Sequence, residues 1–195
     1  MASERHRRNS IASLQLADGT PCSTHDLLAT AFWSALKNRM GVAKGIVMAY
    51  NMNTMLDPVD GLDALVAPFD RKEMDDTIKF MPADKSPGPD GFNGRFLKSC
   101  WSIICSDFYR LAEDFHSGHA DLEGLNGSFI TLIPKKAVPE TVNDFRPISL
   151  TSVGIKFLTK MAANRFQKDI RRCIHKNQYG FIERSIQDCI VWTLE

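Results

Sequence analysis

The chain has 195 residues, a net charge of +1 and 44% hydrophobic residues, proportions typical of a globular protein and not of a disordered, collagen-like or coiled-coil one. No apolar run approaches the roughly 18 residues of a membrane span, and the basic residues 1–15 lack the apolar core of a secretory signal. Five scattered cysteines, none in a Cys-x-x-Cys pair, favour a reduced chain. We therefore expect an intracellular protein, nuclear or cytoplasmic, that is neither secreted nor membrane-bound.

Positive charge gathers in the second part of the chain. Residues 1–127 carry a net charge of −4 and residues 128–195 a net charge of +5. Within the latter, residues 135–176 hold 10 basic and 3 acidic side chains, a net charge of +7. Such a window suits an anionic partner, such as a nucleic-acid backbone or a triphosphate. A solvated helix face explains the same window equally well.

The first third of the chain predicts one helix between two loosely organised stretches. Asp-Gly-Thr-Pro at residues 18–21 is a turn signal that favours a short hairpin. The apolar periodicity of residues 25–40 predicts a helix, and Gly41 is a typical residue to end it. Residues 42–68 lack clear periodicity, so we interpret them as a linker.

Two more helices are predicted around a loop rich in proline and glycine. Asp70, followed by Glu73, forms the pattern of a capping box for a helix that ends near Met81. The breaker residues of 84–91 predict a defined loop. A strongly apolar helical pattern then covers residues 93–117, and a glycine follows it.

The remaining elements are a ribbon and further helices. The β-favouring residues 129–133 and 146–150 predict an antiparallel ribbon joined by a basic loop. Residues 153–173 have helical periodicity, residues 177–182 read as a turn, and residues 185–195 as the start of another helix. The predicted fold class is therefore α+β, mostly helical, with a small antiparallel sheet.

Metal and acid–base signals are weak. His116 and His119 lack further ligands at a known zinc spacing and read as a polar helix end. The Asp75-Asp76 doublet lies in a predicted helix, where neighbouring side chains point about 100° apart. We interpret it as charge near the helix N-terminus and not as a two-metal site.

Three phrases, taken together, are specific. They are Lys-Ser-Pro-Gly-Pro-Asp-Gly-Phe at residues 85–92, Phe-Ile-Thr-Leu-Ile-Pro-Lys-Lys at 129–136 with Asp-Phe-Arg-Pro-Ile-Ser-Leu at 144–150, and Asn-Gln-Tyr-Gly-Phe-Ile at 177–182 with Arg-Ser-Ile-Gln-Asp at 184–188. In this order and spacing they resemble the reverse transcriptase of LINE-type (non-LTR) retrotransposons, plant elements in particular. The resemblance runs from about residue 68 to the end of the sequence.

The resemblance implies part of a right-hand polymerase. Residues 1–68 would be a linker-like region with one helix, and residues 69–195 a partial reverse transcriptase domain of N-terminal extension and fingers, without palm and thumb. Intact relatives are RNA-directed DNA polymerases that use Mg²⁺, dNTPs, an RNA template and a DNA primer. Their catalytic carboxylates belong to palm motifs that this sequence lacks. We therefore expect no catalytic residue, no bound metal and no activity from this chain alone, unless a palm-containing polypeptide acts in trans.

The resemblance also assigns binding residues. Lys135 and Arg146 match the residues that reach the triphosphate of the incoming nucleotide, and an arginine can grip two phosphate oxygens at once. The residues that match template or primer contacts are Pro87, Gly88, Asp90, Gly91, Gln178, Phe181 and Arg184.

Each of these assignments has an alternative in which the residue has a purely structural role. The prolines and glycines of residues 87–91 could only shape a turn, Lys135 and Lys136 could be ordinary loop-tip lysines, and Arg146 could pair with Asp144 or Glu140. For the whole chain, the alternatives to a truncated, inactive reverse transcriptase are a nucleic-acid-binding module without catalysis and an unselected pseudogene product.

Overall fold

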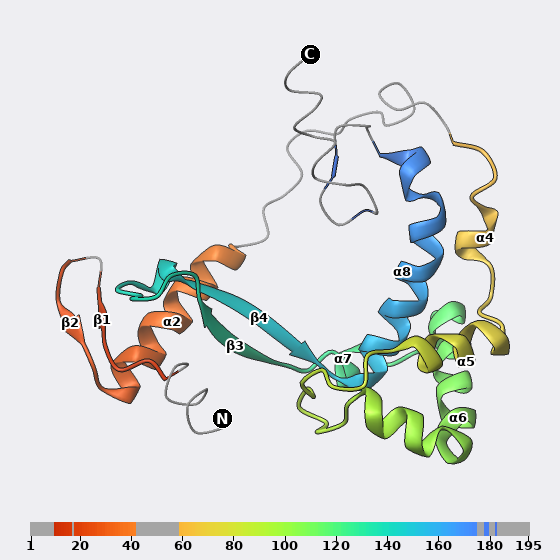
Figure 1. Cartoon of the computed structure of the whole chain (residues 1–195), viewed down its shortest axis with the longest axis horizontal. Coiled ribbons are helices and arrows are strands. Elements are labelled where there is room, and N and C mark those ends of the chain that lie inside the picture. The colour runs from red at the N-terminus through yellow and green to blue at the C-terminus, as the bar shows by residue number, and fades with distance from the viewer. Residues whose placement is uncertain (1–9, 17, 42–58, 175–177, 180–181, 183–195) are drawn as a thin grey trace. The chain divides into compact units, whose positions relative to one another are not determined.

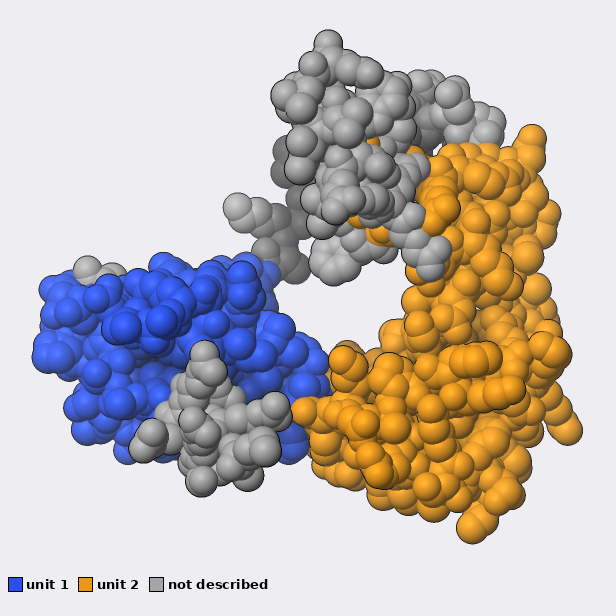
Figure 2. All heavy atoms as spheres, viewed as in Figure 1, with its two compact units in different colours: residues 1–50, 129–150 blue, residues 51–128, 151–195 orange. Residues whose placement is uncertain are grey.

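A computed structural model describes residues 10–16, 18–41, 59–174, 178, 179 and 182 (Figure 1). This part of the chain is mostly helical and holds two small sheets of two strands each. It divides into two compact units, residues 1–50 with 129–150 and residues 51–128 with 151–195 (Figure 2). The boundary suggested near residue 68 and the assignment of residues 69–195 to a polymerase domain stay predictions.

The first unit begins with the predicted hairpin and helix. Strands β1 (Leu14–Gln15) and β2 (Pro21–Cys22) pair antiparallel, with a turn between them in which Gly19 takes a φ of +83°. Helix α2 (His25–Met40) follows, and Gly41 ends it at a φ of +69°. Both predictions for this stretch are confirmed.

The second part of this unit is the predicted ribbon. Strands β3 (Ser128–Pro134) and β4 (Phe145–Thr151) form a two-stranded sheet and run in opposite directions (Figure 1). A loop with one 3₁₀ turn, η1 (Val142–Asp144), joins them. Phe145 is buried and packs edge-on against Phe32 of α2, with ring centroids 5.3 Å apart. This contact fixes one face of the ribbon on the helix.

The second unit consists of helices. They are α4 (Asp63–Val66), α5 (Arg71–Phe80), α6 (Gly94–Ser117), α7 (Leu122–Leu125) and α8 (Val153–Cys173). Their core combines buried aliphatic side chains with an aromatic cluster in which Phe157 meets Trp101 and Phe108. Burial of these apolar surfaces is the main force that stabilises the unit.

Local signals explain where these helices begin and end. The side chains of Asp70 and Asn93 accept hydrogen bonds from the backbone N–H groups of Glu73 and Phe96, three residues on. Gly118 ends α6 in the left-handed region. The predicted helix bounds are confirmed to within a residue or so.

Three predictions need correction or lie, wholly or in part, outside the described residues. Residues 59–68 were assigned to a linker, but they include the short helix α4. Residues 42–58, most of the turn at 177–182 and the helix expected from residue 185 lie outside the described residues. Within the described part, no helix is long and apolar enough to cross a membrane.

Candidate functional site

The ribbon brings the two predicted triphosphate ligands to its loop end. Lys135 follows β3 directly, and Arg146 is the second residue of β4. The backbone N–H of Lys135 donates to the carbonyl of Asp144 over 2.7 Å, which closes the ribbon at this point. The Lys135 ammonium donates to the Asn143 carbonyl over 2.7 Å. An ammonium has three donors, so two remain for a ligand.

Lys136 is engaged differently from Lys135. Its ammonium lies 3.1 Å from the Asp144 carboxylate and 3.5 Å from that of Glu140. Asp144 also accepts from the backbone N–H groups of Glu140 and Thr141, each over 2.9 Å. These backbone hydrogen bonds, with the help of Lys136, hold the pKa of Asp144 well below its ordinary value. Lys136 is therefore part of the loop framework.

The unit itself supports this loop from two sides. Arg39 of α2 donates to the Asn143 side chain over 2.5 Å. The backbone N–H of Gln15, in β1, donates to the Glu140 carbonyl over 2.7 Å. The loop that presents Lys135 is thus positioned before any ligand arrives, which reduces the entropy that binding must overcome.

Arg146 is an exposed guanidinium, and its side chain has no hydrogen bond or ion pair with the described part of the chain. The alternative that it pairs with Asp144 or Glu140 is wrong, because both carboxylates face Lys136. Since strand residues alternate between faces, Arg146 points away from the face on which Phe145 packs. Its donors are therefore available to a ligand.

The face that carries Arg146 is mainly apolar, although the exposed Thr131 also lies on it. Alternation along β3 and β4 places Phe129, Ile133 and Ile148 on it, with exposed fractions of 59%, 45% and 40%. A guanidinium beside exposed apolar side chains suits a ligand that combines an anion with an apolar or aromatic part.

The loop of residues 87–91, assigned to the template, makes close contacts within its own unit. Gly88 is buried, and a Cβ atom there would lie 2.2 Å from the backbone oxygen of Thr151. Gly91 takes a φ of +74° and donates its N–H to the Gly88 carbonyl over 3.1 Å. Pro87 is exposed. The two glycines are thus required by the turn and by its packing on the start of α8.

Asp90 forms a hydrogen bond with a residue 63 positions later in the sequence. Its carboxylate accepts from the backbone N–H of Val153 over 2.5 Å and from that of Phe92 over 3.2 Å. It therefore caps α8 in place of Ser152, whose hydroxyl donates to the Leu125 carbonyl instead. These contacts do not test template binding by residues 87–91, which stays a prediction.

The third group of predicted site residues is described only in part. Gln178 is exposed, whereas Phe181 and Arg184 lie outside the described residues. The structure therefore places Lys135 and Arg146 on one ribbon and Gly88, Asp90 and Gly91 in one loop of the other unit.

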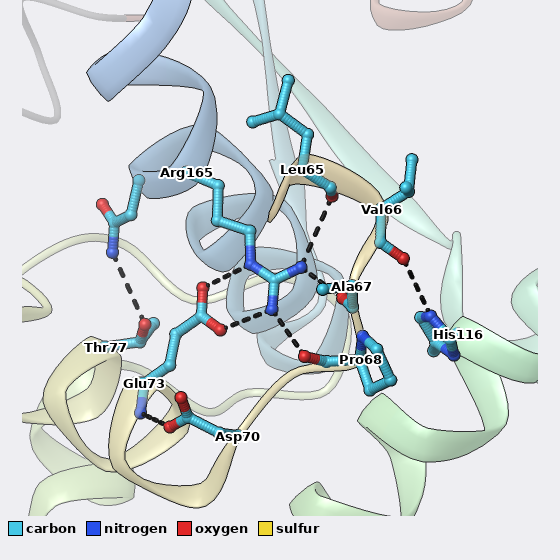
Figure 3. Close-up of polar contacts among 10 residues, drawn as sticks. Leu65, Val66, Ala67, Pro68, Asp70, Glu73, Thr77, His116 and Arg165 are labelled. Atoms are coloured by element: carbon cyan, nitrogen blue, oxygen red, sulfur yellow. Dashed lines mark hydrogen bonds and ion pairs between the residues drawn. The ribbon is translucent and has the colours of Figure 1, made fainter. Parts of the chain in front are cut away.

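Sequence reasoning missed a polar cluster around Arg165 of α8 (Figure 3). Its Nε and Nη2 each donate to the Glu73 carboxylate over 2.7 Å, and Phe69 lies under the guanidinium at 4.2 Å. The remaining donors reach backbone carbonyls of Leu65, Ala67 and Pro68. We call this cluster the Arg165 clamp, and it fastens the segment before α5 to α8. The sequence signal was absent, because Glu73 and Arg165 are 92 positions apart.

The interpretation of Asp75 as simple helix-terminal charge is wrong. Its carboxylate accepts from Trp101 Nε1 over 2.8 Å and from the Tyr109 hydroxyl over 2.7 Å, which joins α5 to α6. The same hydrogen bond raises the pKa of Tyr109 to about 12. Asp76 pairs with Lys72.

The described residues do not fit the metal pair of an intact polymerase. Among them, no group of three or more His, Cys, Asp or Glu side chains is placed to hold a metal ion. We therefore derive no step through Mg²⁺ for this chain.

Comparison with known proteins connects the chain to a transposon. It is 31% identical, over 128 residues, to a 149 kDa protein of transposon TX1 from Xenopus laevis that is itself described as uncharacterized. The match covers 65% of this chain and 10% of the relative, so the chain spans about a tenth of that protein's length. No protein-family model matches the sequence. The expected likeness to a transposon protein is confirmed, and its plant-like character stays a prediction.

Proposed function

We propose that this chain is the N-terminal extension and fingers portion of a LINE-type reverse transcriptase, and that its ribbon binds the triphosphate of an incoming dNTP. The observation that carries the proposal is Arg146, an exposed guanidinium without a partner in the described chain, beside a lysine on a braced ribbon. The similarity to a transposon protein supports the same direction.

The chemistry of a triphosphate suits the ribbon. Its oxygens need fixed cations, and a guanidinium grips two of them through parallel hydrogen bonds. Lys135 is held at the end of β3 by its bond to the Asn143 carbonyl, and Pro147 fixes the backbone next to Arg146. The apolar side chains on the Arg146 face would lie against the base or sugar of the same nucleotide.

A second candidate is a nucleic-acid-binding module without catalysis. The net charge of +7 over residues 135–176 favours it, because such a window attracts the phosphate backbone whether or not a palm is present. The two candidates share the ribbon and differ in whether a free dNTP binds.

The test is binding of a labelled RNA–DNA primer-template and of a fluorescent dNTP analogue, both followed by anisotropy. Lys135→Ala/Arg146→Ala should weaken dNTP binding. If the ribbon contacts the nucleic-acid backbone, as in the second candidate, the same variant should also reduce the slope of log affinity against log salt for the primer-template by about 2. The matched control is Lys79→Ala/Lys98→Ala, which removes two exposed lysines of the second unit that lie outside the charged window of residues 135–176.

Three outcomes separate the candidates. If the ribbon variant loses dNTP binding and the control variant keeps it, the result supports the triphosphate site. Primer-template binding without dNTP binding supports the second candidate. Equal loss in ribbon and control variants, or templated primer extension by the chain alone, contradicts the proposal.

A further inference from the structure

A cavity of about 430 Å³ lies in the second unit, between the chain that follows α5 and one face of α8. Its mainly apolar floor includes Met81, Pro82 and Ala163. Three lysines line it, Lys85 from the loop and Lys156 and Lys160 from the helix. It is distinct from the ribbon, and the predicted template residues 87–91 do not line it.

Positive charge at this cavity is not neutralised by its lining. None of the residues that line it is acidic. The ammonium of Lys156 donates to the Ser86 carbonyl over 2.8 Å and keeps two further donors. Lys85 and Lys160 are exposed and have no side-chain partner in the described part of the chain. The nearby carboxylate of Asp84 is paired with Arg95.

The walls of the cavity are held in place. Gly94, at the start of α6, comes so close to the preceding loop that a Cβ atom would lie 2.3 Å from the Pro82 oxygen. The backbone N–H of Arg95 donates to the Ala83 carbonyl over 3.2 Å. The loop is therefore docked on α6, and its bond from Lys156 fixes it to α8, so the cavity is formed without a ligand.

We propose that this cavity binds one unpaired nucleotide of a single-stranded nucleic acid. The base or sugar would lie on the apolar floor, and the phosphates on either side would meet Lys85 on the loop and Lys160 on the helix. A duplex buries its bases in the stack and offers only phosphates, so it could not fill the floor. The inference rests on the proposed function, because a chain that handles a template strand needs a place for an unpaired nucleotide in addition to the dNTP site on the ribbon.

An acidic peptide with an apolar side chain is the competing ligand. A nucleic-acid strand fits better, because it places an anion on both sides of every base, as the lysines on opposite walls require. The choice is settled by competition between a labelled strand and a glutamate-rich peptide of equal charge.

The test compares a labelled single strand of about 12 nucleotides with a duplex of the same sequence, using the full chain. Lys85→Ala/Lys160→Ala should lower the single-strand salt slope by about 1.4, which is about 0.7 for each lost phosphate contact. Ala163→Leu keeps the charge and a good helix former but fills the floor, so single-strand affinity should fall about fivefold or more. Duplex binding should not change with Ala163→Leu, and Lys79→Ala/Lys98→Ala is again the charge control.

Each result bears on one proposal. Single-strand affinity that survives both cavity variants but is lost in Lys135→Ala/Arg146→Ala overturns the cavity and leaves the proposed function intact. Absence of single-strand binding overturns the cavity, and absence of dNTP binding overturns the proposed function. Displacement of the strand by the peptide at matched charge overturns the choice of ligand. A photoreactive nucleotide should cross-link within residues 81–85 or 159–163, and cross-links that map elsewhere also overturn the cavity.

Discussion

Arg146 on the ribbon and Arg165 in the clamp have the same chemical group in opposite situations. Arg165 uses all of its donor directions on Glu73 and backbone carbonyls, and its side chain is 11% exposed. Arg146 is exposed and has no side-chain partner in the described chain. Because a buried cation must be paired, the first arginine is explained by the fold alone. The second is not, which is why we assign it to a ligand.

The same contrast separates the loop of residues 87–91 from the cavity beside it. The carboxylate of Asp90 and the backbone at Gly88 are occupied by contacts with the start of α8. Lys85 and Lys160 nearby have no such partners in the described residues. Residues whose polar groups are hydrogen-bonded within the unit thus stabilise its fold, whereas residues whose polar groups lack such partners can bind a ligand.

The largest expected effect comes from opening the clamp. Arg165→Ala leaves Glu73 as a poorly solvated carboxylate without its partner and should lower the free energy of unfolding by about 3 kcal/mol. Arg110→Ala is the control, since this arginine is 72% exposed and its bridge to Asp107, three residues earlier on the same helix, should contribute at most about 0.5 kcal/mol. Urea unfolding followed by circular dichroism measures both. Equal losses in the two variants would show that the clamp is an ordinary surface contact.

Gly88→Ala should have the next largest effect. The added methyl would collide with the backbone of Thr151, which cannot rotate away, so we expect a loss of about 2 kcal/mol. Gly127→Ala is the matched control, because its Cβ would approach nothing nearer than a Pro89 atom at 4.0 Å. If both variants unfold at the same urea concentration, the close approach of the loop to α8 is contradicted.

Asp90 should contribute less than Gly88. Asp90→Ala removes the cap from the first N–H of α8 and should cost about 1 kcal/mol of stability. Asp90→Asn keeps an acceptor in the same place, so it should recover most of that loss. A variant series in which alanine and asparagine are equally harmful would argue against capping.

The ribbon loop predicts a pH dependence. Because the folded-state pKa of Asp144 is depressed, its contribution to stability is present above the ordinary carboxyl pKa and is lost as the pH falls through the lowered value. Wild type should therefore exceed Asp144→Asn in stability at pH 7, and the difference should shrink in acid. Thermal unfolding of both proteins at several pH values checks this. A stability difference between wild type and Asp144→Asn that grows in acid would contradict the prediction.

The smallest effect on stability is expected for Arg146→Ala. A side chain without partners should change the free energy of unfolding by no more than about 0.5 kcal/mol. The same variant should lose ligand affinity, as described above. A marked loss of stability would reveal an internal role for Arg146 and remove the contrast with Arg165.

Sequence reasoning was sufficient where the signal is local. Apolar periodicity and residues such as Asp70 and Gly118 predicted α5 and α6 nearly to the residue. The ribbon was predicted because its strands are β-favouring and separated by a short loop. The sequence could not predict whether Arg146 lacks a partner. The conformation of the loop decides whether the Asp144 carboxylate pairs with Arg146 or with Lys136.

Contacts between distant residues could not be predicted. A capping-box pattern indicated that Glu73 would bind its own helix, but Arg165 takes its carboxylate instead. Ser152 stands at the N-cap position of α8, but its side chain does not cap the helix, and Asp90 does so from another loop. In each example a polar side chain had a plausible local partner, and a tertiary contact replaced it.

The close approach of Gly88 to Thr151 has a consequence for how such chains are recognised. Gly88, Asp90 and Gly91, which the loop needs to fit against the start of α8, will persist in any descendant of this chain that still folds. Their presence in a related sequence therefore marks a chain that folds in this way, and carries no information about whether that chain binds a ligand. Comparisons of related sequences that look for binding would do better to score positions whose side chains the fold leaves unused, such as Arg146.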